Sequence, residues 1–212
     1  MLLAFDTATE LVSVAVHDGT DVISEASSQV PMKHGEHLAP LIAQTLASAG
    51  IDRTELTAIV VGVGPGPFTG LRVGVVTARV LAMVLDIPVY GVCTLDALAL
   101  EAVHTGQVEG EFLVATDARR KEVYLASYDA EGTRLSGPVV VKPAEVATAA
   151  PVVGRGPGLY PEHFTNAVGP DRPAAGWLAR AVVAEAVEIL DPEPLYLRRP
   201  DAVAGAARKS VS

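Results

Sequence analysis

The sequence is poor in cysteine, in aromatic residues and in positive charge. Its single cysteine, Cys93, excludes a disulfide framework and favours a reducing compartment. Aromatic residues make up only 5% of the 212 residues, which favours packed α/β layers of Val, Leu, Ile and Ala over a surface that stacks on bases. The net charge of −9, without a lysine-rich run, disfavours a chain that binds nucleic acid alone.

Long apolar runs are also lacking. Pro, Gly, Asp or Arg interrupts each apolar stretch before it reaches membrane-spanning length, and Asp6 comes too early for a signal peptide. Two short basic clusters, 119–121 and 198–199, are of a size more often found in solvated turns. We therefore expect a soluble, cytoplasmic protein with no membrane partner.

The first half alternates strand and helix patterns. Residues 2–8, 12–16 and 21–27, with a turn at Asp18-Gly19, predict a three-stranded antiparallel meander. Helical spacing and buried-strand runs then predict helices at 38–49, 71–85 and 95–104, and strands at 58–63 and 88–92. A glycine-containing linker at 105–111 divides the chain into units 1–105 and 106–212.

The second half repeats the first. Five pairs share one offset: Asp6 with Asp117, Val12 with Val123, Val14 with Leu125, Ala15 with Ala126, and Asp18 with Asp129. The Gly/Pro run 60–68 is echoed at 152–160, and we expect a helix after each copy, at 71–85 and 174–190, the second of which could pack across both units. We interpret this as a duplication in which the second half lost a helix; the alternative is chance similarity among Val/Gly/Pro-rich strands and turns.

Two such units, each opening with an acid-ended hairpin, suit a nucleotide held between them. Hairpin amides can contact phosphates while an aspartate positions a metal or a water. Residues 6–9 are small enough for this, but 117–121 are bulky and lack glycine. Asp6 is equally explained as an acid that caps local amides, and for Asp117 a structural role with Arg119 is the leading interpretation.

The segment 64–70 leads into a helix, where free amides favour an anion, and Thr69 is the predicted N-cap. No Gly-Lys-Ser/Thr follows, so a plain strand-to-helix turn is the favoured interpretation. In the helix itself Gly70, Gly74, Ala78 and Ala82 recur every four residues and form a smooth face. A helix that is apolar all round must be buried, in its own unit or partly against another chain.

Catalytic groups are not recognisable. His34 and His37 lie three residues apart at a helix start, but a hydrolytic metal site needs a third ligand and a base. Ser13, Ser127 and Cys93 lie in strand patterns without a nearby base. We expect no metal and no catalytic residue.

Four segments resemble the TsaB (YeaZ) family: Phe5-Asp6-Thr7-Ala8-Thr9, the run from Gly64 to Gly74, Gly91-Val-Cys-Thr-Leu95, and the run from Asp117 to Tyr124. One departure is Pro67, where a serine is common. The resemblance implies an α/β fold of two actin-like (ASKHA) lobes related by duplication, with mixed sheets flanked by helices and a reduced second lobe.

The resemblance also implies a role in forming threonylcarbamoyladenosine at position 37 of ANN-decoding tRNAs. Such a chain does not catalyse the transfer. It heterodimerises with the catalytic paralogue TsaD, is joined by the P-loop ATPase TsaE, forms a homodimer when alone, and meets tRNA only through the complex. No cofactor is then expected to bind this chain strongly, with ATP or ADP placed at the complex interface.

Two sets of residues are candidates for these contacts. The partner surface carried over from the family comprises His34, His37, Leu38, Leu41, Gly70, Leu71, Arg72, Gly74, Val75, Ala78 and Ala82. A vestigial or interface nucleotide site would comprise Asp6, Thr7, Thr9, Gly64, Gly66, Thr69 and Gly70. Two alternatives remain: a stand-alone ATPase or glycoprotease-like metallopeptidase of the same fold, and a stand-alone tRNA-binding module, which the charge disfavours.

Overall fold

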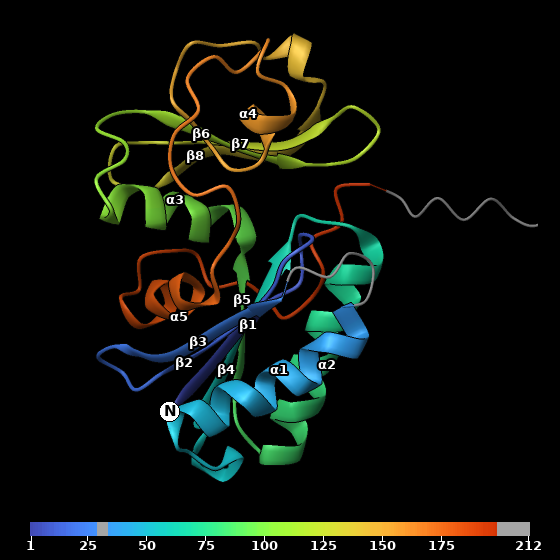
Figure 1. Cartoon of the computed structure of the whole chain (residues 1–212), viewed down its shortest axis with the longest axis vertical. Helices are drawn as coiled ribbons and strands as arrows, with labels where there is room; N and C mark the ends of the chain where they lie inside the picture. The colour runs from blue at the N-terminus through green and yellow to red at the C-terminus, as the bar shows by residue number, and fades with distance from the viewer. Residues whose placement is uncertain (29–33, 199–212) are drawn as a thin grey trace, which may run out of the picture.

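The computed structural model describes residues 1–28 and 34–198, and these form two lobes, each built on one β-sheet (Figure 1). The first lobe carries a five-stranded sheet of order β3-β2-β1-β4-β5, and the second a four-stranded sheet of order β8-β7-β6-β9. In both sheets a central strand pairs antiparallel with the next strand in the chain and parallel with a later one. This shared topology fits the duplication inferred from the sequence.

The first sheet confirms the predicted opening meander. Its strands are β1 (Leu2–Asp6), β2 (Val12–His17), β3 (Val22–Ser28), β4 (Ala58–Gly64) and β5 (Val89–Cys93). β1, β2 and β3 pair antiparallel, while β4 is parallel to β1 and to β5. Both faces of β1 and β2 are buried, so helices must cover the sheet on either side.

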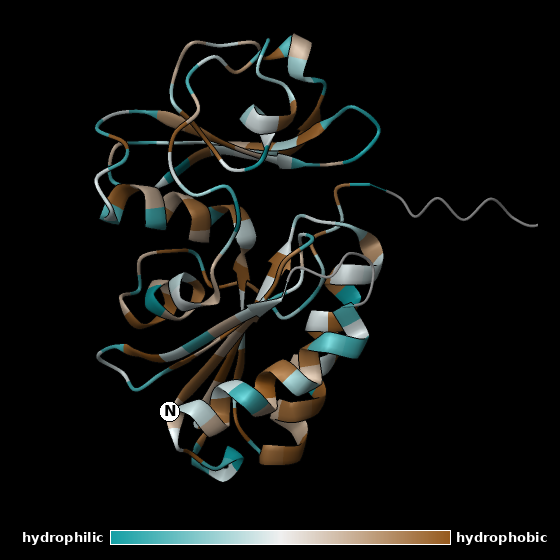
Figure 2. Cartoon of the chain, in the orientation of Figure 1, coloured by the Kyte–Doolittle hydropathy of each residue, from teal (hydrophilic) through white to brown (hydrophobic). Residues whose placement is uncertain are grey.

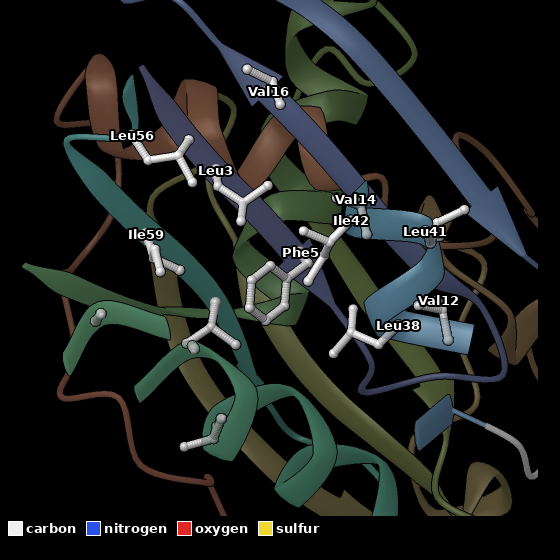
Figure 3. Packing of buried hydrophobic residues seen from close by; sticks show 14 of the residues in the cluster. Leu3, Phe5, Val12, Val14, Val16, Leu38, Leu41, Ile42, Leu56 and Ile59 are labelled. Carbon is white, nitrogen blue, oxygen red and sulfur yellow. The ribbon is translucent and has the colours of Figure 1, made fainter. Parts of the chain in front are cut away.

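Helices α1 (His34–Ala49) and α2 (Phe68–Leu85) cover one face of this sheet, and α5 (Ala175–Val183) covers the other (Figure 1). A short 3-10 helix, η1 (Arg53–Glu55), follows α1. In Figure 3 Phe5 and Val14 of the sheet face Leu38 and Ile42 of α1, and this cluster is the main core of the first lobe.

The second sheet consists of β6 (Phe112–Asp117), β7 (Val123–Tyr128), β8 (Arg134–Val141) and β9 (Val152–Val153). Helix α3 (Thr94–His104) covers the face of this sheet that is turned towards the first lobe. The short helices η2 (Pro143–Glu145) and α4 (Gly156–Leu159) follow β8 and β9. The sequence pattern does not predict β8, because Gly137-Pro138 interrupts it.

The prediction of the last helix is wrong in its length and in its assignment as the second copy of α2. α5 ends at Val183 rather than at residue 190, and Glu185 just beyond it has a left-handed backbone with φ of 52°. The helix that follows the second Gly/Pro run is α4, which has only four residues. α5 instead packs on β1 and β2 of the first sheet, so it is not a second copy of α2.

The alignment of the two hairpins by one constant offset is also wrong, because it fails for their second strands, β2 and β7. Asp6 pairs with Ser13, whereas Asp117 pairs with Val123, so the second turn is one residue shorter. By this register Tyr124, not Leu125, is the counterpart of Val14. A sequence alignment without a gap could not show this.

Helix α2 is more apolar than the sequence analysis allowed. Its 18 residues have a mean hydropathy of 1.6, so by length and composition it could cross a membrane. The expectation that no stretch reaches this length is therefore wrong. Because α2 packs along β4 and contributes Val75, Ala78 and Ala82 to the core, it is a core helix with one exposed side.

Candidate functional site

The row of small residues on α2 packs inside this chain. Gly70, Gly74, Ala78 and Ala82 are all buried, and Ala78 lies in the core cluster between α2 and the first sheet. Of the two alternatives for this helix, the smooth face is therefore buried in its own unit. The same spacing that lets two helices approach closely here lets α2 approach its own sheet.

Two glycines show how close that approach is. A Cβ at Gly74 would overlap Thr7 Oγ1, and a Cβ at Gly66 would overlap the Ala8 carbonyl oxygen. The Thr7 hydroxyl is itself buried and donates a hydrogen bond of 2.7 Å to the Gly70 carbonyl. The glycines thus let the loop and α2 pack closely on the first hairpin. The atoms that they approach belong to Thr7 and Ala8 of this chain.

The start of α2 also differs from the prediction. The helix begins at Phe68, and Pro67 is its N-cap residue without a side-chain cap hydrogen bond. Thr69 therefore lies inside the helix, and its assignment as N-cap is wrong. Proline fits this position because its ring fixes φ at about −65°, close to the −60° of Pro67.

Asp6 is fully buried at the end of β1. Its carboxylate accepts hydrogen bonds from the Ala8 amide at 2.7 Å and from Thr94 Oγ1 at 2.6 Å. Burial raises the pKa of this carboxyl above its ordinary value, despite both hydrogen bonds. These contacts match the structural alternative, an acid that caps a local amide, and they leave the side chain without solvent exposure.

The cleft between the lobes is small and filled with ion pairs. It has a volume of about 120 Å³, and Thr9, Pro67 and Thr116 contribute to its lining. Arg119 pairs with Glu10 of the first lobe at 2.9 Å and with Asp117 of the second at 3.2 Å, which confirms the predicted Asp117–Arg119 contact. This volume lies below the roughly 300–1,000 Å³ that ligand pockets usually measure.

The two histidines do not converge. His34 Nε2 donates to the Thr9 carbonyl at 2.7 Å and so fixes the start of α1 to the first hairpin, while His37 is half-buried further along the helix. Across residues 1–28 and 34–198, no group of three His, Cys, Asp or Glu side chains could hold a metal ion.

The exposed side of α2 is an apolar strip that the sequence analysis did not single out. Val76, Val80, Met83 and Val84 are 57%, 47%, 75% and 71% exposed. Figure 2 shows the hydrophobic colour running along α2 to the outside of the molecule. The only sequence signal was that α2 is apolar all round, and this signal does not say which side faces out.

Helix α1 borders this strip with its own exposed small residues. Gly35, Ala39, Ala43 and Ala47 recur every four residues on its outer side. Between the two helices lies a groove of about 510 Å³, lined by Gly35, Leu38, Ala39, Phe68, Thr69, Arg72, Val73, Val76 and Thr77. We call the strip, the small residues of α1 and this groove the α1–α2 face.

Most residues predicted for the partner surface lie beneath this face. Arg72 is exposed, and His34 and His37 are half-buried. The others are buried in this chain: Leu38, Leu41, Gly70, Leu71, Gly74, Val75, Ala78 and Ala82. The predicted helices carry the exposed face, but these buried residues support it from within.

The C-terminal segment borders the same face. Tyr196 stacks on Phe68 with ring centroids 5.0 Å apart, and Arg72 Nε donates to the Tyr196 hydroxyl at 3.0 Å. The Arg72 guanidinium also lies 3.9 Å from the Phe68 ring centre. The Leu195 amide bonds to the Val63 carbonyl at 2.8 Å, so the segment is attached to the first lobe.

The fold is that of a reduced actin-like protein. It has two mixed sheets with flanking helices, and each lobe opens with a hairpin whose first strand ends in an aspartate. A sequence model described as "TsaD: tRNA N6-adenosine threonylcarbamoyltransferase" matches residues 25–160. The structure superposes on YeaZ from Pseudomonas aeruginosa with a TM-score of 0.78 and 30% identity, covering 92% of this chain and 99% of that one.

Sequence relatives agree with this assignment. An uncharacterised protein of Mycobacterium tuberculosis is 43% identical over 212 residues, covering 95% of this chain and 93% of that protein. The tRNA threonylcarbamoyladenosine biosynthesis protein TsaB of Escherichia coli is 38% identical over 128 residues, covering 60% of this chain and 54% of that protein. The chain belongs to the TsaB (YeaZ) family.

Proposed function

We propose that this chain is a non-catalytic subunit that activates TsaD in forming threonylcarbamoyladenosine at position 37 of ANN-decoding tRNAs, by heterodimerising through the α1–α2 face. TsaE would join the same assembly, and two copies of this chain would pair through this face when TsaD is absent. Family membership, and the names of relatives such as the Escherichia coli TsaB, support the pathway.

The observation that carries the proposal is the exposed apolar strip. Fully burying a Val or Met side chain is worth roughly 1.5–3 kcal/mol. Covering these four partly exposed side chains with a partner would therefore stabilise the complex by about 4 kcal/mol. A face of this kind, beside a groove, is typical of a protein–protein contact. The small residues of α1 would let a partner helix approach closely.

A non-catalytic role is supported by the cleft. Asp6 is buried and occupied by two hydrogen bonds, and the arginines that line the cleft are paired with carboxylates. We accordingly propose that this chain alone binds no nucleotide strongly, and that any ATP or ADP of the complex is held at its interface.

Reconstitution tests the proposal. TsaD, TsaE, ATP, a preformed activated threonylcarbamoyl donor and tRNA are assayed for modified adenosine with and without this chain, and the heterodimer is measured by calorimetry. The double variant Val76→Glu/Val84→Glu places two charges in the contact, which costs roughly 3 kcal/mol, so we expect about 100-fold weaker binding to TsaD. An unchanged modification rate without this chain would contradict the proposed activation.

A matched control keeps the test specific. Leu135→Glu/Val139→Glu changes two similarly exposed apolar residues on β8 of the second lobe. We expect this variant to bind TsaD within about twofold of wild type, because exposed substitutions away from a contact have small effects. Equal loss in both variants would contradict the assignment of the face.

A further inference from the structure

The groove between α1 and α2 is apolar except for one cation. Among the described residues that line it, Arg72 alone is charged, and the others are Gly, Ala, Leu, Val, Thr and Phe. Apolar walls with a few fixed polar groups are typical of a site that takes its ligand in one orientation. The position of Arg72 in this groove therefore bears on what the groove can bind.

The Arg72 side chain is held in place within this chain. Its Nε donates a hydrogen bond of 3.0 Å to the Tyr196 hydroxyl, and its guanidinium carbon lies 3.9 Å from the centre of the Phe68 ring. Phe68 and Tyr196 are themselves stacked. A long side chain that is ordered before binding loses less rotamer freedom when a partner arrives, so this arrangement favours a contact through Arg72.

The held guanidinium still has unused donors. Across residues 1–28 and 34–198, Arg72 belongs to no ion pair, and its hydrogen bond to Tyr196 occupies Nε only. The edge formed by Nε and one Nη is thereby blocked, whereas the end of the group, formed by its two Nη atoms, is open. Two parallel hydrogen bonds from this end match the two oxygens of a carboxylate.

Arg72 differs in this respect from the arginines of the cleft between the lobes. Arg119 and Arg155 pair with carboxylates of this chain, Glu10 and Asp171. A partner that covered the groove would take Arg72 out of water, and a desolvated charge is costly unless it is paired. The groove is therefore suited to an apolar segment that also carries an acidic side chain.

A second copy of this chain does not offer such an acid opposite the groove. The acids of the two helices are Glu36 in α1, which already has an interaction partner, and Asp86 at the C-cap of α2. At 1.5 Å per residue Asp86 lies about 21 Å along the helix axis from Arg72. The charge of the groove thus favours a different protein over a second copy.

We propose that Arg72, positioned by Tyr196 and Phe68, binds a carboxylate of the protein that covers the α1–α2 face. The carboxylate approaches the two Nη atoms end-on, while the apolar part of the same segment fills the groove. The proposal rests on the proposed function, because it gives the chemistry by which that partner is recognised. Tyr196 is a positioning residue in it, and Arg72 makes the contact.

Binding of TsaD to variants of this chain, measured by calorimetry, tests the contact. Arg72→Gln should weaken the heterodimer about 30-fold, as expected for a buried arginine anchor, and should reduce the salt dependence of binding. Arg72→Lys should weaken it about tenfold, because an ammonium group cannot make the same pair of parallel bonds.

The matched control for this loss is Arg53→Gln. It makes the same charge change at an exposed arginine of η1, outside the groove, and should stay within about twofold of wild type. Equal losses at both positions would show a general effect of charge and overturn the proposal.

A double-mutant cycle separates positioning by Tyr196 from a structural role. Tyr196→Phe keeps the ring on Phe68 but removes the hydroxyl that accepts from Arg72, so it should weaken the heterodimer about threefold. In the Arg72→Gln background the same change should have no further effect on binding. An equal loss in both backgrounds would contradict positioning through Arg72.

The partner's carboxylate is identified by changing the acidic residues of TsaD one at a time to the corresponding amide. One such variant should bind the wild-type chain about as weakly as TsaD binds Arg72→Gln, and combining the two changes should cause no further loss. If every acidic residue of TsaD fails this test, Arg72 binds no carboxylate and the proposal is wrong.

Sedimentation of this chain without TsaD tests a second copy as the occupant. Arg72→Gln should leave self-association within about twofold of wild type. If Arg72→Gln and Asp86→Asn instead weaken self-association while the heterodimer is unchanged, the groove takes a second copy and the proposal is wrong. Failure of the proposed function is a different result, since the wild-type chain itself would then not bind TsaD.

Discussion

Substitution of Gly74 by alanine tests how α2 is seated on the first lobe. A Cβ there would lie well under 3.0 Å from Thr7 Oγ1, while its distance to Thr7 Cβ, 3.6 Å, is an ordinary contact. Thr7 cannot move away cheaply, because it is buried and its hydroxyl bonds to the Gly70 carbonyl. The new Cβ therefore crowds the packing of α2 and displaces the hydroxyl from this buried hydrogen bond.

The expected cost follows from three contributions. Overpacking costs about 1–3 kcal/mol, and a buried hydroxyl left without a partner costs about 1–3 kcal/mol. Alanine regains roughly 1 kcal/mol of helix propensity over glycine. We therefore expect Gly74→Ala to lower the free energy of unfolding by about 1–5 kcal/mol, measured by urea denaturation followed by circular dichroism.

A double-mutant cycle identifies the cause. Thr7→Ala removes Oγ1, the atom that the new Cβ would overlap, so Gly74→Ala in that background should be neutral or stabilising by up to about 1 kcal/mol. Gly35→Ala on α1 is the control, because its Cβ would meet only Val73 Cγ2 at 3.9 Å. If Gly74→Ala is as destabilising in the Thr7→Ala background as in the wild-type chain, the overlap is not the cause and the reasoning is refuted.

Two further predictions concern Glu101 of α3 and Tyr196 of the C-terminal segment. Burial, and then the Glu25 carboxylate, raise the pKa of Glu101 from 4.5 to about 7. The folded state then binds more protons than the unfolded one, so this group's contribution to stability is lost as pH rises from about 4.5 to 7. Because Glu101 is only half-buried, we expect Glu101→Gln to remove about 1 kcal/mol of that pH dependence. Urea denaturation at pH values on either side of this window measures it. If stability changes with pH equally in the variant and in the wild-type chain, the prediction is contradicted. Tyr196→Ala should lower the free energy of unfolding by about 1–2 kcal/mol through loss of the Phe68 stack and the Arg72 hydrogen bond, and Tyr196→Phe by about 0.5 kcal/mol; equal losses would show that the stack contributes nothing.

Local periodicity predicted most of the first lobe, because its strands and helices are long and regular. The meander of β1 to β3, the buried strand β4 and helices α1 to α3 follow from patterns that need no tertiary information. The second lobe was predicted less well. β8 contains Gly137-Pro138, and β9 has two residues, so neither carries an alternation long enough to recognise.

Contacts between distant segments lay outside what the sequence shows. Asp6 was correctly placed at a strand end, but its bond to Thr94 depends on how β5 leads into α3, 88 residues further on. The Tyr196–Phe68 stack likewise joins the C-terminal segment to the start of α2. Such contacts depend on how whole elements pack together. The sequence around each residue alone does not indicate its distant partner.

The Gly/Pro segment 64–70 and the helix after it show how a correct pattern led to a wrong face. Small residues every four positions show that something packs closely against a helix, but not whether it is a sheet of the same chain or a partner. On α2 the close neighbours are Thr7 and Val61, so its small side faces inward and its valines face out. On α1 the row from Gly35 to Ala47 faces out instead. Substitutions at Gly74 or Ala78, which the sequence alone favours as interface tests, would therefore report on folding, and only the exposed valines can report on a partner.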